Sequence, residues 1–484
     1  MIDNVYDLIT TNMERLYADN VAFRFYDEQT DTVSAVRFGD YAQDIRRAVT
    51  YFKTTIPDIQ GRKVCLLSRN CYEYAVNSFG IMMAGGVLVP MNQRKTWDEL
   101  QYELELVEPA AILTDGEDYG YQAELTAAYG SLLRPMDGFR ACEPAQLTRC
   151  IDPDALLVLM FTSGTTGRSK GVMLCERNFF TVMHLHVQIG ERMCEIKQDP
   201  NLVVSQFTVL PMFHLGAFIC LFSWAMKGWG LNVSSNIRNF YHDIQRMPSQ
   251  VMAVVPTILN SLHHDVQRGR QDRLGGLWVP ICSSAMFDPA VLLDMAHHGM
   301  FIVQTYGSTE TCGDGLVNYA QDAAHIGAIG KPDDHCEYKL DHGEICMRGG
   351  SVMLGYYKDP EATAEVIDKD GWFHTGDLAR EDEQGYYFLT GRKKNLIILG
   401  SGENVSPEEL EALVEKSPAV KECIVKELGK KIGVVVYCEQ ERQQDVRAFI
   451  TEVNRTLPLY KRMSAVEFSA EPLPRNAAGK LLRQ

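Results

Sequence analysis

Phe161-Thr-Ser-Gly-Thr-Thr-Gly-Arg-Ser-Lys-Gly-Val-Met173 is the most distinctive stretch of the chain, and the apolar run from Ala155 to Met160 before it predicts a buried strand. Its glycines allow backbone N–H groups to turn toward an anion, while the hydroxyls add donors and the lysine adds charge. We interpret the stretch as a phosphate-binding loop, although an ordinary turn between a strand and a helix has a similar composition. It is not a Walker A loop, because Arg168 follows Gly167.

Length and charge limit the possible classes of protein. A chain of 484 residues predicts one large domain with one or two smaller ones. A hydrophobic content of 46% with 23% charged residues is typical of a globular protein with a sizeable core. The net charge of −16 argues against nucleic acid as a partner, because binding it relies on lysine and arginine.

The sequence predicts a cytoplasmic location. The amino terminus lacks a basic region followed by an apolar one, so we expect no secretory signal. The most apolar stretch, Gly216 to Met226, is too short to span a bilayer and predicts a buried core element. Thirteen cysteines without a Cys-x-x-Cys pair indicate reduced thiols, with neither a disulfide framework nor a zinc site.

The first large region predicts an α/β fold. Residues 38–52 carry apolar side chains at helical spacing. Strand, helix and strand follow at 64–67, 72–84 and 87–89, which predicts a right-handed βαβ unit, and 111–114 predicts another parallel strand. The phosphate-binding loop then lies at a strand end, where ligands bind in α/β folds.

Further polar side chains are expected in turns, and most of them allow two interpretations. His214 after Leu210-Pro-Met-Phe is a functional candidate, but a lone histidine more often packs in a core. Glu310 could cap a helix or hold Mg²⁺ through oxygen. Asp377 lies between glycine and leucine in a turn. Lys480 near the carboxyl terminus could simply be exposed, and the basic run 391–395 is either a solvated face or a hinge.

The last third predicts a different architecture. Short hairpin strands are expected at 343–350 and 385–390. Ser406-Pro-Glu-Glu409 predicts the start of a helix with a capping box. Strands at 422–426 and 432–438 and a helix over 446–456 complete a compact α+β module.

Taken together, the order and spacing of these turns resemble the adenylate-forming superfamily of acyl-CoA synthetases, firefly-type luciferases and peptide-synthetase adenylation domains. The resemblance covers essentially the whole chain. The matching motifs are Thr162 to Gly171, Tyr306-Gly-Ser-Thr-Glu310, Gly355-Tyr-Tyr, Thr375-Gly-Asp377, Gly391-Arg392, Gly402-Glu-Asn-Val-Ser-Pro and Pro474 to Lys480.

The resemblance implies a fold and a division into domains. It predicts a large N-terminal domain of layered α/β subdomains with a small distorted β-barrel, over residues 1–391, which binds ATP and the acid. A hinge at 392–396, with Lys394 at the hinge position, leads to a small mobile α+β domain over 397–484.

The resemblance also implies a reaction, in which a carboxylic acid and ATP form an acyl-AMP and pyrophosphate. Thr165, Thr166 and Lys170 would bind the β- and γ-phosphates, Glu310 and Thr165 would hold Mg²⁺, and Thr309 would bind the α-phosphate. The predicted nucleotide-binding residues are Thr162, Ser163, Gly164, Thr165, Thr166, Gly167, Lys170, Ser283, Ser284, Ala285, Thr305, Tyr306, Gly307, Asp377 and Arg392, and the predicted catalytic residues are His214, Thr309, Glu310 and Lys480.

Further roles follow from the same resemblance. Asp377 would accept hydrogen bonds from the ribose hydroxyls and Arg392 would fix the nucleotide, while Ser283 to Ala285 would border the adenine. Lys480 would bridge the substrate carboxylate and the α-phosphate. The small domain would then rotate, so that a thiol replaces the lysine loop.

His214 directs the choice among family members. Amino-acid-activating relatives commonly carry aspartate after the phenylalanine, whereas here histidine follows Phe213, as in acyl- and aryl-CoA ligases. We therefore predict a carboxylate–CoA ligase for a fatty or aryl acid, active as a monomer or homodimer. The alternatives are a stand-alone enzyme that loads a carrier-protein phosphopantetheine and a non-catalytic nucleotide-binding relative.

The chain departs from the family pattern at several positions. Ser169 stands where relatives usually carry proline, and Ser283 and Ser284 stand where they carry glycine. Thr305 replaces a frequent glycine beside the expected acyl pocket and should narrow it. The C-terminal module lacks a loop between its strands, over 426–432.

Overall fold

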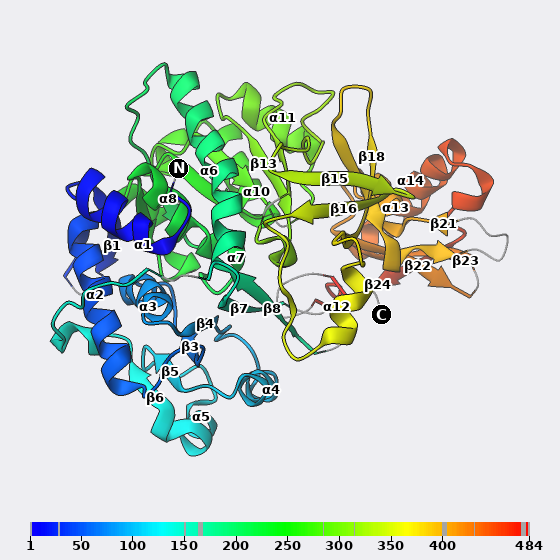
Figure 1. Ribbon diagram of the computed structural model, residues 1–484. Helices are drawn as coiled ribbons and strands as arrows, with labels where there is room; N and C mark the ends of the chain where they lie inside the picture. The colour runs from blue at the N-terminus through cyan, green and yellow to red at the C-terminus, as the bar shows by residue number, and fades with distance from the viewer. Residues whose placement is uncertain are drawn as a thin grey trace. The chain divides into compact units, whose positions relative to one another are not determined.

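The computed structural model describes residues 2–27, 30–149, 152–162, 168–283, 285–313, 315–398, 404–429, 431–475 and 481–482 (Figure 1). The chain divides into two compact units: the first comprises Met1–Glu337 and Arg348–Gly371, and the second comprises Tyr338–Met347 and Trp372–Gln484. This division assigns strands on the N-terminal side of residue 391 to the second unit. The predicted hinge at 392–396 concerns motion and stays a prediction.

A seven-stranded sheet in the first unit carries the predicted βαβ unit. Its strands, in spatial order, are β17 (Gly355–Tyr356), β8 (Lys170–Cys175), β7 (Leu156–Thr162), β4 (Val87–Pro90), β3 (Lys63–Leu67), β5 (Ala111–Thr114) and β6 (Leu133–Pro135). From β7 to β6 the neighbours are parallel, and β8 and β17 join antiparallel at one edge. The predicted strands at 64–67, 87–89 and 111–114 are confirmed.

The second large sheet of the first unit has eight strands. In spatial order they are β14 (Gly315–Asn318), β13 (Val303–Gly307), β12 (Val279–Cys282), β11 (Val251–Val254), β9 (Ser205–Thr208), β10 (Gly230–Val233), β1 (Val21–Asp27) and β2 (Thr32–Arg37). All neighbours from β13 to β1 are parallel. The amino-terminal hairpin β1–β2 was not predicted from the sequence.

Helices connect these strands, in keeping with an α/β fold (Figure 1). The apolar face predicted for 38–52 is buried in α2, where Tyr41, Ile45 and Phe52 are at most 1% exposed. The apolar stretch 216–226 forms two short core helices, and no helix in the described ranges is long and apolar enough to cross a membrane. The α-helices of this unit are α1 (Val5–Asp7), α2 (Phe38–Thr55), α3 (Tyr72–Met83), α4 (Trp97–Val107), α5 (Gln122–Tyr129), α6 (Glu176–Lys197), α7 (Leu215–Phe218), α8 (Cys220–Lys227), α9 (Phe240–Arg246), α10 (Pro256–Gln267), α11 (Pro289–His297) and α12 (Pro360–Val366), with a π-helix, η1, at Leu8–Leu16.

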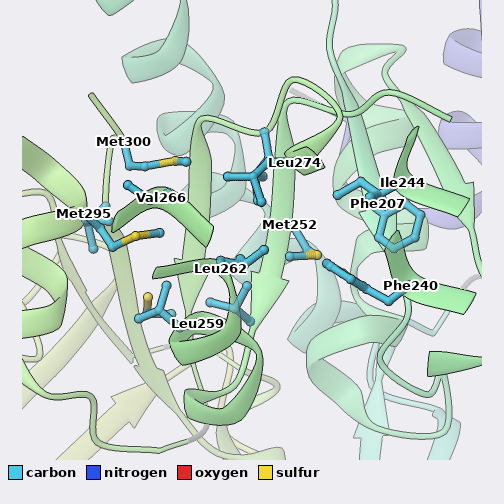
Figure 2. Close-up of a cluster of buried hydrophobic side chains, with 14 of the residues drawn as sticks. Phe207, Phe240, Ile244, Met252, Leu259, Leu262, Val266, Leu274, Met295 and Met300 are labelled. Carbon is cyan, nitrogen blue, oxygen red and sulfur yellow. The ribbon is translucent and has the colours of Figure 1, made fainter. Parts of the chain in front are cut away.

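Helices α9, α10 and α11 pack on the eight-stranded sheet through one apolar cluster (Figure 2). Phe207 of β9, Met252 of β11, Leu259 and Leu262 of α10, and Met295 of α11 all belong to this cluster. Each of these side chains is at most 1% exposed. The cluster therefore fixes the strands whose carboxyl ends carry several predicted site residues.

The second unit contains a four-stranded sheet where we expected a distorted barrel. Its strands, in spatial order, are β15 (Cys336–Asp341), β16 (Glu344–Gly349), β18 (Phe373–Glu381) and β19 (Tyr387–Arg392). In the part of the chain that the structure describes, these strands form an open sheet and not a closed barrel. Strands β15 and β19 stand at the two ends of the order, so the sheet keeps two edges.

The predicted α+β module forms the rest of the second unit. Strands β22 (Glu422–Leu428), β23 (Lys431–Tyr437) and β24 (Ala465–Ser469) form a sheet, accompanied by α13 (Pro407–Val414), α14 (Gln443–Thr456) and the short pair β20 (Ile397–Ile398) and β21 (Asn404–Val405). The predicted capping box is wrong. Ser406 Oγ donates to Glu408 over 3.0 Å, and Glu409 is bound by Lys461 instead.

Candidate active site

Several predicted site residues of the first unit follow parallel strands at one edge of the eight-stranded sheet. His214 comes after β9, Ser283 and Ala285 come after β12, and Tyr306 and Gly307 end β13. Because β9, β11, β12 and β13 are parallel neighbours, their carboxyl ends lie at the same edge. This edge is the place where an α/β fold binds ligands.

His214 is held in an exposed turn at the start of α7. Its backbone oxygen accepts hydrogen bonds from Ala217 N over 3.1 Å and from Phe218 N over 3.0 Å. Its ring lies 4.4 Å from the Phe213 ring. Asn70 fixes the turn by donating to Leu210 O over 2.9 Å and by accepting from the next segment of backbone. The exposed position makes His214 available to a ligand, whereas a packing role would have buried it.

Lys170 and Glu310, which lie 140 residues apart in the sequence, meet on one aromatic side chain. The Lys170 ammonium lies 4.8 Å from the centre of the Tyr356 ring, and Tyr356 OH donates to Glu310 Oε1 over 2.9 Å. The structure therefore brings together the predicted phosphate ligand and the predicted magnesium ligand, with Tyr356 between them.

Strand pairing sets the position of Tyr356. The short strand β17 pairs antiparallel with β8, so that Tyr356 lies opposite Val172. Glu310 O also accepts a hydrogen bond from Met353 N over 2.8 Å, which ties the same segment to the turn after β13. Burial and the nearby Glu310 carboxylate raise the pKa of the Tyr356 phenol, so it stays a donor at neutral pH.

Tyr356 has no predicted role, although Gly355-Tyr-Tyr was among the matching motifs. The signal was present in the sequence, but only the strand pairing with β8 shows what the side chain does.

Glu310 offers carboxylate oxygens of the kind that Mg²⁺ prefers, and Thr309 beside it offers a hydroxyl for the α-phosphate. Both belong to η6 (Thr309–Thr311), a 3₁₀ turn after β13, and both are partly exposed. The donor set thus fits a magnesium ion. The predicted ligands Ser163, Gly164, Thr165, Thr166 and Gly167, together with Ser284 and Lys480, lie outside the described residues.

The predicted ribose and nucleotide ligands of the second unit bind each other. Asp377 on β18 and Arg392 on β19 are cross-strand partners, and Arg392 Nε lies 2.7 Å from Asp377 Oδ1. Asp377 is 14% exposed and Arg392 is 42% exposed, so solvent reaches more of the arginine than of the carboxylate. The pairing holds the carboxylate in one orientation.

A buried glutamate supports the turn before Asp377. Glu344 Oε1 accepts from Gly376 N over 3.0 Å, and its other oxygen accepts from Lys393 Nζ over 2.8 Å. Burial alone would raise the pKa of Glu344, but hydrogen bonds from Lys393 and His374 outweigh it and hold the pKa below its usual range. Glu344 therefore stays ionised as it orients the turn.

Three potential metal ligands meet on the four-stranded sheet, which the sequence did not indicate. Asp341, Cys346 and His374, on three neighbouring strands, place one ligand atom each within 4.8 Å of the others. Their separation in sequence gives no metal-binding spacing. His374 Nδ1 also lies 3.3 Å from Glu344 Oε2, so the ring helps to hold the glutamate that supports the turn before Asp377.

Lys394 was predicted at the hinge and Lys480 in the mobile domain, and the structure describes only the first of these two side chains. Lys394 is exposed in a 3₁₀ turn, η7 (Lys393–Asn395). Lys480 lies outside the described residues, but the backbone on both sides of it pairs. Arg475 and Leu481 form an antiparallel bridge, and Leu482 N donates to Pro474 O over 2.8 Å.

The comparison with known families decides what kind of protein carries this geometry. A model of the family described as AMP-binding enzyme matches residues 17–357. The chain belongs to the AMP-binding enzyme family. The predicted membership of the adenylate-forming superfamily is confirmed. The prediction that the chain is an enzyme and the prediction of a mixed α/β fold with a small C-terminal region are also confirmed.

Relatives within the AMP-binding family cover most of the chain. The 2-succinylbenzoate–CoA ligase of Bacillus cereus is 30% identical over 451 residues, which are 88% of this chain and 88% of that protein. The long-chain-fatty-acid–CoA ligase of Salmonella typhimurium is 28% identical, over 97% of this chain and 91% of that protein.

A solved structure shows the same fold. The O-succinylbenzoate coenzyme A synthetase of Bacillus subtilis, in complex with ATP and a magnesium ion, matches with a TM-score of 0.83 and 24% identity. The match covers 99% of this chain and 98% of that chain.

Proposed function

We propose that this protein is an ATP-dependent carboxylate–CoA ligase. It activates a carboxylic acid as an acyl-AMP with release of pyrophosphate and then transfers the acyl group to the thiol of CoA. The observation that supports this most is the meeting of Lys170 and Glu310 on Tyr356 in a member of the AMP-binding family. A phosphate ligand and a magnesium ligand are thereby held together.

Each residue of this group has a role in the first step. Lys170 binds the β- and γ-phosphates, with Thr162 to Gly167 as further ligands, and Thr309 binds the α-phosphate. Glu310, with Thr165, would hold Mg²⁺, which neutralises charge on the phosphates when bound. Catalysis of phosphoryl-type transfer consists mainly of positioning and charge stabilisation, which these residues supply.

The nucleoside end is bound by residues that the structure describes only in part. Ser283, Ser284 and Ala285 border the adenine, and Thr305, Tyr306 and Gly307 are the other nucleotide-binding residues of this edge. Asp377 accepts hydrogen bonds from the ribose hydroxyls. Arg392, which pairs with one oxygen of Asp377, helps to fix the nucleotide.

Lys480 carries the bond-forming step and Lys394 serves as the hinge. Lys480 bridges the carboxylate of the acid and the α-phosphate, so positive charge is concentrated where the new bond forms. The C-terminal module then rotates about 392–396 and replaces the lysine by the thiol.

The acid is a fatty or aryl acid without an amino group. His214 stands after Phe213 where an amino-acid-activating enzyme would carry an anchoring carboxylate, and it lies exposed at the ligand-binding edge. The relatives named above act on acids of different shapes, a long chain and a succinylated benzoate. We place the enzyme in the cytoplasm, as a monomer or homodimer.

Thioester formation with two acceptors tests the proposal. The protein is incubated with ATP, Mg²⁺, a panel of fatty and aryl acids and either free CoA or a phosphopantetheinylated carrier protein. Acyl-CoA, AMP and pyrophosphate in equal amounts are expected with free CoA. Thioester on the carrier alone would instead establish the stand-alone loading enzyme, and no product with either acceptor would contradict both.

A further inference from the structure

A buried polar cluster lies beside the predicted phosphate-binding loop. We define the Glu103 cluster as Lys95, Glu103 and Ser169. Glu103 of α4 is completely buried and pairs with the Lys95 ammonium, which is 10% exposed. Ser169 Oγ donates to Glu103 Oε1 over 2.5 Å and lies 3.4 Å from Lys95 Nζ. Three segments of the first unit are thus joined by charged hydrogen bonds.

The cluster carries an electrostatic cost. Burial raises the pKa of Glu103, although Lys95 and Ser169 both oppose the rise. The second oxygen, Oε2, is buried and has no hydrogen-bond partner within the described ranges. A buried ion pair of this kind contributes little net stability compared with apolar side chains of the same volume. The Glu103 cluster is therefore explained better by a role in positioning than by a contribution to stability.

The position of the cluster indicates that role. Helix α4 and the turn before it contact the chain on both sides of residues 163–167. Lys95 lies 5.9 Å from the centre of the Phe161 ring, and the guanidinium of Arg168 lies 4.8 Å from the centre of the Tyr102 ring. Ser169 is the residue between Arg168 and Lys170.

Lys170 is constrained on both sides by these contacts. Ser169 is held by Glu103, and Lys170 begins β8 and lies over Tyr356. A change in the position of Ser169 therefore moves the backbone from which the Lys170 side chain starts.

We propose that Lys95 and Glu103 are positioning residues that act through Ser169 to hold Lys170 for the β- and γ-phosphates of ATP. This proposal rests on the proposed function, because it assumes that Lys170 binds those phosphates. It makes a specific distinction between nucleotides. AMP lacks the β- and γ-phosphates, so its binding is independent of the cluster.

Equilibrium binding of MgATP and of AMP to the full chain tests the proposal without any need for the acid substrate. Ser169→Ala and Glu103→Gln are expected to weaken MgATP binding about tenfold, the effect of losing one charged hydrogen bond, and to change AMP binding less than twofold. Ser169→Thr keeps the hydroxyl and is expected to bind MgATP as the parent does.

Glu176→Gln is the matched control, because Glu176 is also a buried carboxylate of the first unit, where it accepts from Val5 N over 2.7 Å. It is expected to leave both affinities unchanged. Equal MgATP affinity in the parent, Ser169→Ala and Glu103→Gln would overturn the positioning role while leaving the proposed function intact. Failure of the folded parent to bind MgATP would overturn both.

Discussion

At the scale of single residues, Tyr356 is the side chain that links the two halves of the first-step machinery. Its ring faces Lys170 and its hydroxyl donates to Glu310, so a single aromatic residue helps to position two charged side chains. The motifs around Lys170 and Glu310 were readable from the sequence because glycine, hydroxyl and acidic residues follow strands there. Tyr356 was not assigned a role, because a pairing between β17 and β8 leaves no pattern in a two-residue strand.

Tyr356→Phe tests this link. The variant keeps the ring under Lys170 but loses the hydrogen bond to Glu310, which as a bond to a charged group contributes about 1.5–3 kcal/mol. We expect the rate of acyl-AMP formation at saturating ATP to fall at least tenfold. Because the phenol pKa is raised, the deficit should be constant from pH 6 to pH 9. A rate equal to that of the parent would contradict the role given to Tyr356.

Cys346 provides a pH-dependent prediction. Burial, and then the nearby Glu344, raise the pKa of its thiol to about 11. The folded protein thus holds the proton more tightly than the unfolded chain, so stability is complete below about pH 9 and is lost as pH rises through 11. We expect Cys346→Ser to lose less of its free energy of unfolding between pH 9 and pH 11 than the parent, by urea denaturation. An identical loss in both proteins would show that the thiol does not titrate in that range.

At the scale of elements, the helix over 38–52 and the strands and helix between 64 and 114 were predictable, because their apolar spacing is regular. The strand at 64–67 and the helix starting at Tyr72 occur where expected. What the sequence could not predict is contact between elements. In the sequence Lys95 and Glu103 look like ordinary surface charges, and only the fold buries them against Ser169.

Variants of the Lys95–Glu103 ion pair distinguish an effect on the stability of the fold from an effect on the position of Lys170. Lys95→Met leaves the buried Glu103 carboxylate without its cationic partner, which should lower the free energy of unfolding by about 3–5 kcal/mol. The double variant Lys95→Met/Glu103→Leu should recover most of this stability, because apolar side chains of similar volume replace buried ion pairs well. MgATP affinity should remain weak in both variants. A double variant with the stability and the MgATP affinity of the parent would contradict the positioning role.

At the scale of the whole molecule, the order of motifs along the chain predicted the family and its two-part organisation. The predicted distorted barrel was the exception, since four strands form an open sheet in the described part of the second unit. The contact between Asp377 and Arg392 was also beyond the sequence. Both were predicted as nucleotide ligands, and nothing in their spacing indicates that they pair before a nucleotide is bound.

Lys480→Ala tests the division of labour between the two parts of the chain. Loss of the lysine removes the positive charge between the carboxylate and the α-phosphate, so acyl-AMP formation should fall at least a hundredfold. Thioester formation from acyl-AMP supplied to the enzyme should stay within about twofold of the parent, because Lys480 has left the site by then. Lys461→Ala is the control from the same module, where the Lys461 ammonium pairs with Glu409. Normal acyl-AMP formation in Lys480→Ala would remove this residue from the mechanism.

Acid-dependent exchange of labelled pyrophosphate into ATP measures the central step directly, before any thiol is involved. We predict exchange that requires both Mg²⁺ and one class of fatty or aryl acid, that is absent without acid, and that falls at least a hundredfold in Lys170→Ala and Glu310→Gln. The absence of exchange across the whole acid panel, with the folded parent protein, would contradict the assignment of this chain as a carboxylate-activating enzyme.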